Sequence, residues 1–478
     1  MNIKIKKIKK NKKMKSIIFL LFLTTIISQP YSDLVTDLPD YPYKNEMYSG
    51  YLTVSSTKSL HYLYHTAHQD GEHLPLLIWF NGGPYCSSLD GWGEENGPCY
   101  LEGDKFVKNP YSWNKLANVL YIESPAGAGF SFINSNVESE ISMDDDIAAH
   151  DNLIALIEFF NKFPSLRDKD LYISGESYAG IYVPMLASEI LHYNEKVSDS
   201  HKIKLKGILV GNGVTDWKYD TTPATLEFVF THHLIGFELR KDYLKYCLKE
   251  IDVEKCNKCR KKISELINNI NVYDYLRDCE GLQNSNINPN SYYFNYARWA
   301  FPNSLLKSKN KKFLEIIKDE SKSNGMIPCV DTSNIEKYLN RIDVKRALHV
   351  KETIKWELCN MEGYERYRRL EKGSIYTYPY LLNKIRILIY SGDTDLAVPF
   401  NGNQAWIKNL RLPIISEWRS WRAEDLNGNI DKENIAGYRT IYKGLTFVTV
   451  KGTGHMVPQW KRKEAFHMVK RFLADEDL

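Results

Sequence analysis

Short apolar runs alternate with amphipathic segments along most of the chain. The runs that we interpret as strands cover Leu74–Phe80, Asn118–Ile122, Leu171–Ser174, Leu205–Val210, Ile385–Tyr390 and Leu445–Val450. Apolar and polar residues do not alternate within them, which is typical of strands buried on both faces of a parallel sheet. Helices are predicted over 144–163, where apolar residues recur at helical spacing, and over 463–473. The pattern predicts an α/β protein with a mostly parallel central sheet and helices on both faces.

This alternation is interrupted between about residues 214 and 335, where the sequence becomes rich in Lys, Asn and Tyr. Five of the eight cysteines fall in this part: Cys247, Cys256, Cys259, Cys279 and Cys329. We interpret it as a disulfide-braced helical insertion, or lid, that divides the α/β core into residues 31–213 and 336–478. The most polar stretch, residues 306–325, is expected to form an exposed loop.

The N-terminal segment has the pattern of a targeting signal. Eight lysines and no acidic residue occupy positions 1–15, and an apolar run follows over Ile17–Ile27. About ten apolar residues are too few to span a bilayer, which needs roughly twenty. We therefore expect a signal peptide over residues 1–30, with an N-terminal membrane anchor as the alternative. The mature chain is expected to be soluble in the secretory pathway, either secreted or in an acidic lysosome- or vacuole-like compartment.

The net charge changes sign when the lysines of this leader are left out of the count. The chain has 63 basic and 59 acidic residues, for a formal charge of +4. Without the eight leader lysines, 55 basic residues face 59 acidic ones, so the remainder carries about −4. A slightly acidic body argues against a nucleic-acid partner, which requires a basic face. No phosphate-binding or metal-binding motif is present, and Cys256-x-x-Cys259 lacks a second pair, so neither cofactor nor metal is expected.

Polar motifs follow three of the predicted strands. The stretch Gly175-Glu176-Ser177-Tyr178-Ala179 has the small residues that a nucleophile elbow requires on either side of its serine. A serine needs a histidine base, and that base needs an acid to orient it. The stretch 391–395 (SGDTD) offers Asp393 or Asp395 as the acid, and 452–455 (GTGH) offers His455. The order Ser, Asp, His is that of the α/β-hydrolase fold.

Longer stretches carry a family resemblance between about Tyr48 and Phe472. They are residues 79–88 (WFNGGPYCSS), 95–98 (ENGP), 109–114 (NPYSWN), 123–127 (ESPAG), 175–180 (GESYAG), 391–395 (SGDTD) and 454–458 (GHMVP). With these motifs in this order, the chain resembles the serine carboxypeptidases of the carboxypeptidase Y and cathepsin A type. The resemblance implies the α/β-hydrolase fold and peptide or protein C-termini as substrates.

The resemblance also implies a role for each matching residue. Ser177 is expected to be the nucleophile, His455 the base and Asp395 the acid. The backbone N–H groups of Gly83 and Tyr178 are expected to form the oxyanion hole. The group expected to hold the substrate's terminal carboxylate consists of Asn81, Glu95 and Glu176. Two adjacent carboxyl groups share a proton and can donate it to that carboxylate, so activity is expected to be highest in mildly acidic conditions.

Cysteine pairings follow from the same resemblance. It implies Cys86–Cys359 and Cys279–Cys329, and it pairs Cys247 with Cys259 or Cys256. Cys99 and one member of the C-x-x-C then have no partner.

One residue departs from the family pattern. Tyr85 stands where the family usually has Gly, next to the oxyanion residue Gly83. We expect Tyr85 to avoid a positive φ and to bring a bulky ring near the site, with either a reshaped pocket or impaired catalysis.

These observations favour an exopeptidase that releases single C-terminal residues through an acyl-enzyme. The first alternative is an acyltransferase that uses the same three residues with an alcohol or amine as acceptor. The second is a catalytically silent binding or protective protein, which Tyr85 makes conceivable. The group of Asn81, Glu95 and Glu176 favours the peptidase, because it requires a free carboxylate to bind.

Overall fold

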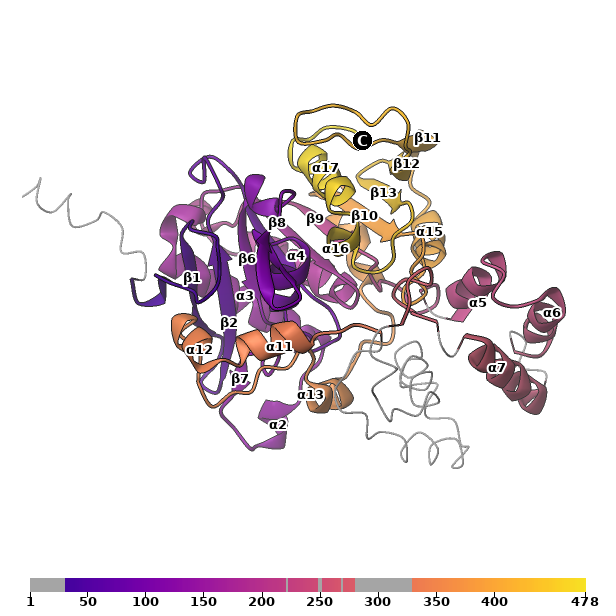
Figure 1. Cartoon of the computed structure of the whole chain (residues 1–478), viewed down its shortest axis with the longest axis horizontal. Helices are drawn as coiled ribbons and strands as arrows, with labels where there is room; N and C mark the ends of the chain where they lie inside the picture. The colour runs from indigo at the N-terminus through magenta and orange to yellow at the C-terminus, as the bar shows by residue number, and fades with distance from the viewer. Residues whose placement is uncertain (1–30, 221, 248–251, 268–269, 280–328) are drawn as a thin grey trace, which may run out of the picture.

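The computed structural model describes residues 31–220, 222–247, 252–267, 270–279 and 329–478 (Figure 1). The expected signal peptide and the expected loop over 306–325 lie outside these residues.

One large mixed sheet runs through the molecule (Figure 1). Its strand order is β1-β2-β6-β3-β8-β9-β10-β13-β12-β11, and β7 pairs with β2. Strands β6, β3, β8, β9, β10 and β13 are parallel neighbours, and the strands at both ends are antiparallel. The bounds are β1 Met47–Thr53, β2 Lys58–His65, β3 Leu76–Phe80, β6 Asn118–Ile122, β7 Phe132–Ile133, β8 Leu171–Glu176, β9 Leu205–Gly211, β10 Arg386–Gly392, β11 Ile414–Trp421, β12 Gly437–Tyr442 and β13 Leu445–Val450. A separate hairpin joins β4 Cys99–Glu102 to β5 Lys105–Lys108.

Side chains of the central strands point alternately to two hydrophobic cores. On one face, Leu76, Ile78 and Phe80 of β3 pack with residues of α3 (Asp145–Lys162), α4 (Ala179–Asn194), α14 (Tyr378–Leu381) and α15 (Phe400–Asn409). On the other face, Leu77 and Trp79 belong to a core with residues of α11 (Ser333–Leu339), α12 (Ile342–Ala347) and α17 (Arg462–Leu473). The expected α/β-hydrolase architecture, with a mostly parallel sheet covered on both faces, is confirmed. Shorter helices are α2 Glu138–Ile141, α13 Met361–Arg366 and α16 Val457–Trp460.

Three helices between the two halves of the core form a third cluster. They are α5 (Thr222–Thr231), α6 (Phe237–Tyr246) and α7 (Val253–Ile267), and in Figure 1 they project beyond the sheet next to α15. The chain then returns to the sheet, since the Val272 carbonyl accepts hydrogen bonds from the backbone N–H groups of Leu396 and Ala397, both 2.9 Å. This arrangement matches the interpretation of residues 214–335 as a helical insertion, whose limits stay a prediction.

Disulfides join Cys86 to Cys359, Cys279 to Cys329 and Cys247 to Cys256. The first two pairings were expected, whereas Cys259, the other candidate partner of Cys247, is a buried free thiol, as is Cys99. Cys247 caps the end of α6, and Cys256 lies in the first turn of α7. Because a helix rises about 1.5 Å per residue, Cys259 lies about 4.5 Å further along α7 from the connection between the helices.

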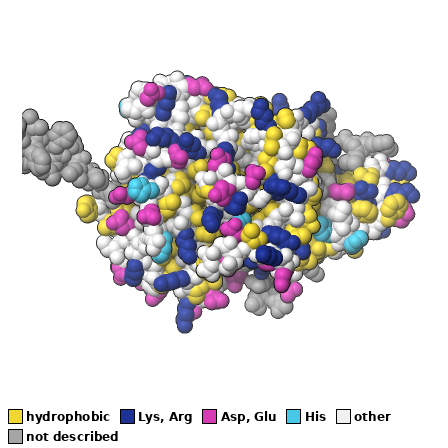
Figure 2. Space-filling model, turned by 90° about the horizontal axis from the view of Figure 1, so that it is seen from above, with side chains coloured by type: hydrophobic (Ala, Val, Ile, Leu, Met, Phe, Trp, Pro, Cys, Tyr) yellow, Lys and Arg dark blue, Asp and Glu magenta, His cyan; other side chains and the backbone are white. Residues whose placement is uncertain are grey.

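Neither membrane-spanning nor metal-binding features occur in the described residues. None of their helices is long and apolar enough to cross a membrane. Among the same residues, no group of three or more His, Cys, Asp or Glu side chains is placed to hold a metal ion. Figure 2 shows acidic and basic side chains interspersed over one face of the molecule rather than segregated by sign.

Candidate active site

Ser177 lies at a sharp turn between β8 and α4. Its φ of 63° falls in the left-handed region, which costs energy for a non-glycine residue and is common at functional sites. The turn is held by its neighbours: the Ser177 N–H donates to the Gly211 carbonyl, and the Ser177 carbonyl accepts from Gly180 and Val214, all 3.0 Å. Gly82, after β3, lies so close that an added Cβ would come within 2.4 Å of the Tyr178 nitrogen. The loop after β3 therefore packs directly against this turn.

His455 and Asp395 meet at the ends of β13 and β10. The distance from His455 Nδ1 to Asp395 Oδ2 is 2.8 Å, and Asp395 is fully buried. Asp393 lies elsewhere, where it accepts a 2.7 Å hydrogen bond from the Gly452 N–H. The sequence spacing allowed either aspartate to be the acid that orients the histidine. In the structure, Asp395 is the one that contacts it.

Hydrogen bonds to Asp395 fix the orientation of its carboxylate. Oδ2 also accepts from Asn212 Nδ2 at 2.7 Å and from the Val398 N–H at 3.2 Å, and Oδ1 accepts from the Ala397 N–H at 2.8 Å. These contacts leave Asp395 an acceptor for the His455 Nδ1–H. The other ring nitrogen, Nε2, is then the acceptor in a neutral imidazole, and it has no hydrogen-bond partner among the described residues.

The residues expected at the oxyanion hole lie at the start of α4 and in the loop after β3. Tyr178 is the first residue of the turn into α4, and Gly83 follows Gly82 with a φ of 109°. The Tyr178 side chain is anchored by Asp145, whose Oδ1 accepts from the hydroxyls of Tyr178 at 2.8 Å and Tyr367 at 2.9 Å. Burial raises the pKa of Asp145 to about 6, against the lowering effect of these hydrogen bonds.

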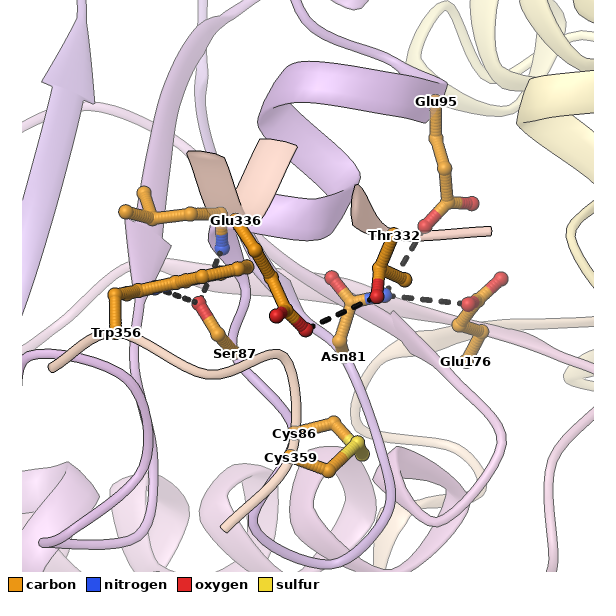
Figure 3. The surroundings of a disulfide bond; sticks show 10 residues. Asn81, Cys86, Ser87, Glu95, Glu176, Thr332, Glu336, Trp356 and Cys359 are labelled. Atoms are coloured by element: carbon orange, nitrogen blue, oxygen red, sulfur yellow. Dashed lines mark hydrogen bonds between the residues drawn. A yellow bond between two sulfur atoms is a disulfide. The ribbon is translucent and has the colours of Figure 1, made fainter. Parts of the chain in front are cut away.

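Asn81, Glu95 and Glu176 form one buried group (Figure 3). Asn81 Nδ2 donates to Glu95 Oε1 at 3.0 Å and to Glu176 Oε1 at 3.2 Å. The Asn81 side chain is itself held, because its Oδ1 accepts from Trp79 Nε1 at 2.7 Å and from the Gly91 N–H at 3.0 Å. Figure 3 shows both glutamates pointing toward the same Asn81 amide.

The two glutamates of this group retain a proton well above the usual pH range of a carboxyl group. Burial, with the charge of Asp90 as the next cause, raises the pKa of Glu95 to about 8. Burial and the charge of Glu95 raise the pKa of Glu176 well above its ordinary value. Because both pKa values are raised, the pair holds at least one proton at neutral pH.

Tyr85 does not behave as expected. Its φ is +72°, so the tyrosine adopts the glycine-like conformation that we expected it to avoid. Its ring is buried in the core, where it packs against Gly127 and Gly363 and lies edge-on to Tyr367 at 5.8 Å. Burial of the ring offsets the backbone strain, which costs on the order of 1 kcal/mol.

A Ser–His–Glu arrangement, separate from Ser177, His455 and Asp395, lies inside the molecule. Ser49 Oγ is 2.9 Å from His61 Nε2, and His61 Nδ1 is 2.8 Å from Glu123 Oε2. All three side chains are fully buried, and the Ser49 hydroxyl donates to the Leu348 carbonyl at 2.6 Å. Trp356 Nε1 and the Phe130 N–H donate to Glu123 as well. A substrate cannot reach this serine, so the arrangement is a structural network.

Sequence reasoning missed two residues that contact this site. Asn212, which holds Asp395, directly follows β9, so the search for polar residues at strand ends would have found it. Tyr273 contacts His455 from the insertion: its carbonyl accepts from the His455 N–H at 2.7 Å, and the rings lie 5.1 Å apart. No sequence signal links these two residues, which are far apart in the chain.

A serine at the turn after β8, an acid after β10 and a histidine after β13 define an α/β-hydrolase. The family model for serine carboxypeptidases matches residues 39–475. The chain therefore belongs to the serine carboxypeptidase family. Serine carboxypeptidase-like 20 of Arabidopsis thaliana is 34% identical, over 93% of this chain and 94% of its own length. The lysosomal protective protein of Mus musculus is 34% identical over 90% of each chain.

A solved structure shares the fold. The crystal structure of a prohormone-processing carboxypeptidase from Saccharomyces cerevisiae superposes with a TM-score of 0.71. The match covers 93% of this chain and 95% of the yeast chain, at 23% sequence identity.

Proposed function

We propose that this chain is an active serine-type carboxypeptidase, which releases single C-terminal amino acids from peptides and proteins. One observation carries the proposal: Glu176, a member of the buried group with Asn81 and Glu95, directly precedes Ser177 in the sequence. A substrate carboxylate held by Asn81, Glu95 and Glu176 therefore has its last peptide bond, and no other, beside the Ser177 hydroxyl. Neither an internal peptide bond nor a blocked C-terminus satisfies this geometry.

In the proposed mechanism, His455 Nε2 accepts the proton of Ser177 Oγ as that oxygen attacks the last peptide carbonyl. Asp395 keeps the imidazole in the required tautomer and stabilises the imidazolium. The backbone N–H groups of Gly83 and Tyr178 donate to the developing oxyanion. His455 then protonates the leaving amine, and water, activated by the same nitrogen, hydrolyses the acyl-enzyme. No cofactor takes part in these steps.

The shared proton of Glu95 and Glu176 has a role in substrate binding. While the pair keeps it, one glutamate donates a hydrogen bond to the substrate's carboxylate. When Glu95 ionises, its negative charge repels that carboxylate. Activity is therefore expected to be favoured in acid and to fall as pH rises through about 8, the pKa of Glu95.

An acidic compartment of the secretory pathway, lysosome- or vacuole-like, suits this pH dependence. The three disulfides and the relation to a mouse protein named for the lysosome support this location.

The proposal is tested by incubating the purified chain with a dipeptide that is blocked at its N-terminus and free at its C-terminus. The incubation is run with and without an amine or alcohol acceptor. Release of the free C-terminal amino acid, absent in Ser177→Ala, supports the carboxypeptidase. Quantitative transfer to the acceptor without hydrolysis indicates the acyltransferase instead. A folded chain that neither hydrolyses the peptide nor reacts with a fluorophosphonate at Ser177 overturns the proposal.

A further inference from the structure

The insertion returns to the core through residues 271–275, which we call the return segment. The loop after β13 lies against it, since the His455 N–H donates to the Tyr273 carbonyl at 2.7 Å. This approach is close, because a Cβ added to Gly454 would overlap the Tyr273 carbonyl oxygen. The backbone of the return segment therefore holds the loop that carries the base.

The loop after β10, which carries Asp395, contacts the return segment on both sides of this acid. The backbone N–H groups of the two residues after Asp395 both donate to the Val272 carbonyl at 2.9 Å. On the other side, the carbonyl of Thr394 accepts from the Tyr275 N–H at 3.1 Å. The return segment thus touches the loops of the acid and of the base together.

Thr394 connects these three parts of the chain. Its N–H donates at 3.0 Å to the Thr453 carbonyl, which belongs to the loop that carries His455. Its hydroxyl donates to Oδ1 of Asp274, in the return segment, at 2.6 Å. The bond between Thr394 and Asp274 is made by two side chains, so a substitution can remove it without altering the backbone.

Asp274 is a fixed acceptor for this hydroxyl. Only 4% of its side chain is exposed. Its Oδ1 also accepts from the Leu276 N–H at 3.2 Å, and its Oδ2 accepts from Arg277 Nε at 3.2 Å. The Arg277 guanidinium in turn lies 4.6 Å from the centre of the Trp460 ring in α16. Because both oxygens are engaged, the carboxylate is held in one orientation toward Thr394.

The distance between the acid and the base depends on how their two loops lie against each other. The 2.8 Å contact between Asp395 and His455 is a good hydrogen bond, and such bonds to nitrogen rarely exceed about 3.2 Å. A displacement of about 1 Å in a catalytic group can cost on the order of 10²-fold in rate. A side-chain contact made one residue before the acid is placed to prevent that displacement.

We propose that Asp274 is a positioning residue for the catalytic acid. Through the Thr394 hydroxyl, it keeps the loop of Asp395 aligned with the loop of His455. The inference rests on the proposed function only in taking Ser177 and these two residues as the reacting groups.

The test compares Thr394→Val, which replaces the hydroxyl by a methyl group, with Thr394→Ser, which keeps it. Two rates are measured: hydrolysis of a blocked dipeptide, and labelling of Ser177 by a fluorophosphonate, which requires the base but not the carboxylate-binding group. Thr394→Val and Asp274→Ala should each lower kcat and the labelling rate by about tenfold and keep KM within about twofold. Thr394→Ser should stay close to wild type.

A double variant and a matched control complete the test. Asp274→Ala/Thr394→Val should be no slower than either single variant, because both changes remove the same hydrogen bond. The control is Asp33→Ala, which removes another buried aspartate that accepts from a hydroxyl (Tyr62, 2.8 Å) and pairs with a cation (Lys162, 2.6 Å). Asp33 lies ahead of β1, so this variant should lose stability but keep kcat and the labelling rate.

The outcomes separate this inference from the proposed function. Wild-type rates in Thr394→Val, equal losses in Thr394→Val and Thr394→Ser, or losses that add in the double variant overturn the inference and leave the carboxypeptidase standing. A wild-type chain that is labelled at Ser177 but hydrolyses no blocked dipeptide overturns the proposed function, and the labelling rates alone then decide the inference.

Discussion

Nδ1 of His455 lies 2.8 Å from Oδ2 of Asp395, although the two residues are 60 positions apart in the chain. They meet because β10 and β13 are parallel neighbours, so that the loops after both strands emerge at the same edge of the sheet. Ser177 reaches this edge through β8, which is separated from β10 by β9 alone. The three residues lie at the same edge of the sheet because of strand order rather than local sequence.

Replacing Asp395 by Asn should reduce kcat by about 10⁴-fold, because an amide no longer holds His455 in the tautomer with its proton on Nδ1. The control is Asp393→Asn, two residues away, which removes an acceptor for the Gly452 N–H and leaves the His455 contact intact. Steady-state kinetics on a blocked dipeptide measures both variants. A loss of activity in Asp393→Asn as large as that in Asp395→Asn would refute the assignment of the acid.

The Glu95–Glu176 pair should set the alkaline limit of activity. In Glu95→Gln and Glu176→Gln, the shared proton is gone, and the fall in kcat/KM that begins near the Glu95 pKa of about 8 should move or vanish. Because each variant also alters carboxylate binding, we expect KM to rise more than kcat falls. The profile of kcat/KM against pH is the readout, and an unchanged alkaline fall in both variants is incompatible with the proposed role.

The same pair should make the fold less stable as pH rises. A carboxyl group whose pKa is raised in the folded state binds more protons there than in the unfolded chain. Its contribution to stability is therefore largest below pH 4.5, the ordinary pKa of the group, and is lost as pH rises to about 8. Glu95→Gln removes this dependence and should stabilise the protein at pH 8, with little effect at pH 4.

Thermal or denaturant unfolding at the two pH values measures this difference. Glu238→Gln, at a site where the side chain is 78% exposed, serves as the matched control and should change stability equally little at both. A Glu95→Gln variant that is destabilised at the higher pH would contradict the raised pKa.

Tyr85→Gly should destabilise the fold even though Tyr85 occupies a glycine-like conformation. Loss of the buried ring costs about 3–5 kcal/mol, whereas relief of the positive φ returns only about 1 kcal/mol. Tyr85→Phe keeps the ring and should be close to wild type. Chemical unfolding of both variants tests this balance, and a Tyr85→Gly variant as stable as wild type would show that the ring does not contribute to the core.

Peptide mapping without reduction should recover Cys247 linked to Cys256, and Cys86 linked to Cys359. Cys99 and Cys259 are buried free thiols, so they should react with an alkylating reagent only after denaturation. A peptide that links Cys247 to Cys259 would contradict the pairing found here.

The central strands could be predicted because burial on both faces produces continuous apolar runs. The runs at Asn118–Ile122 and Leu445–Val450 have the bounds of β6 and β13. The sheet's ends gave no such signal. β11 is exposed at nearly every position, and β1 includes Ser and Gly. Such strands form because a neighbouring strand pairs with them. This pairing cannot be predicted from the sequence of the strand itself.

Part of the site could be predicted for the same reason. A residue that follows a buried parallel strand is fixed at the edge of the sheet, so Ser177, Asp395 and His455 could be proposed from their positions in the chain. The contact between Tyr273 and His455 depends on how the insertion folds back, and the conformation of Tyr85 depends on packing around its ring. Neither is encoded in spacing or periodicity.

The most direct test of the proposed activity is the release of a free amino acid from a blocked dipeptide, followed from about pH 4 to about pH 8. The wild-type chain should release the last residue, most efficiently on the acidic side, and Ser177→Ala should release none. The same dipeptide with an amidated C-terminus should be a much poorer substrate. Equal hydrolysis of the free and amidated peptides, or no hydrolysis by the folded wild-type chain, would contradict the account.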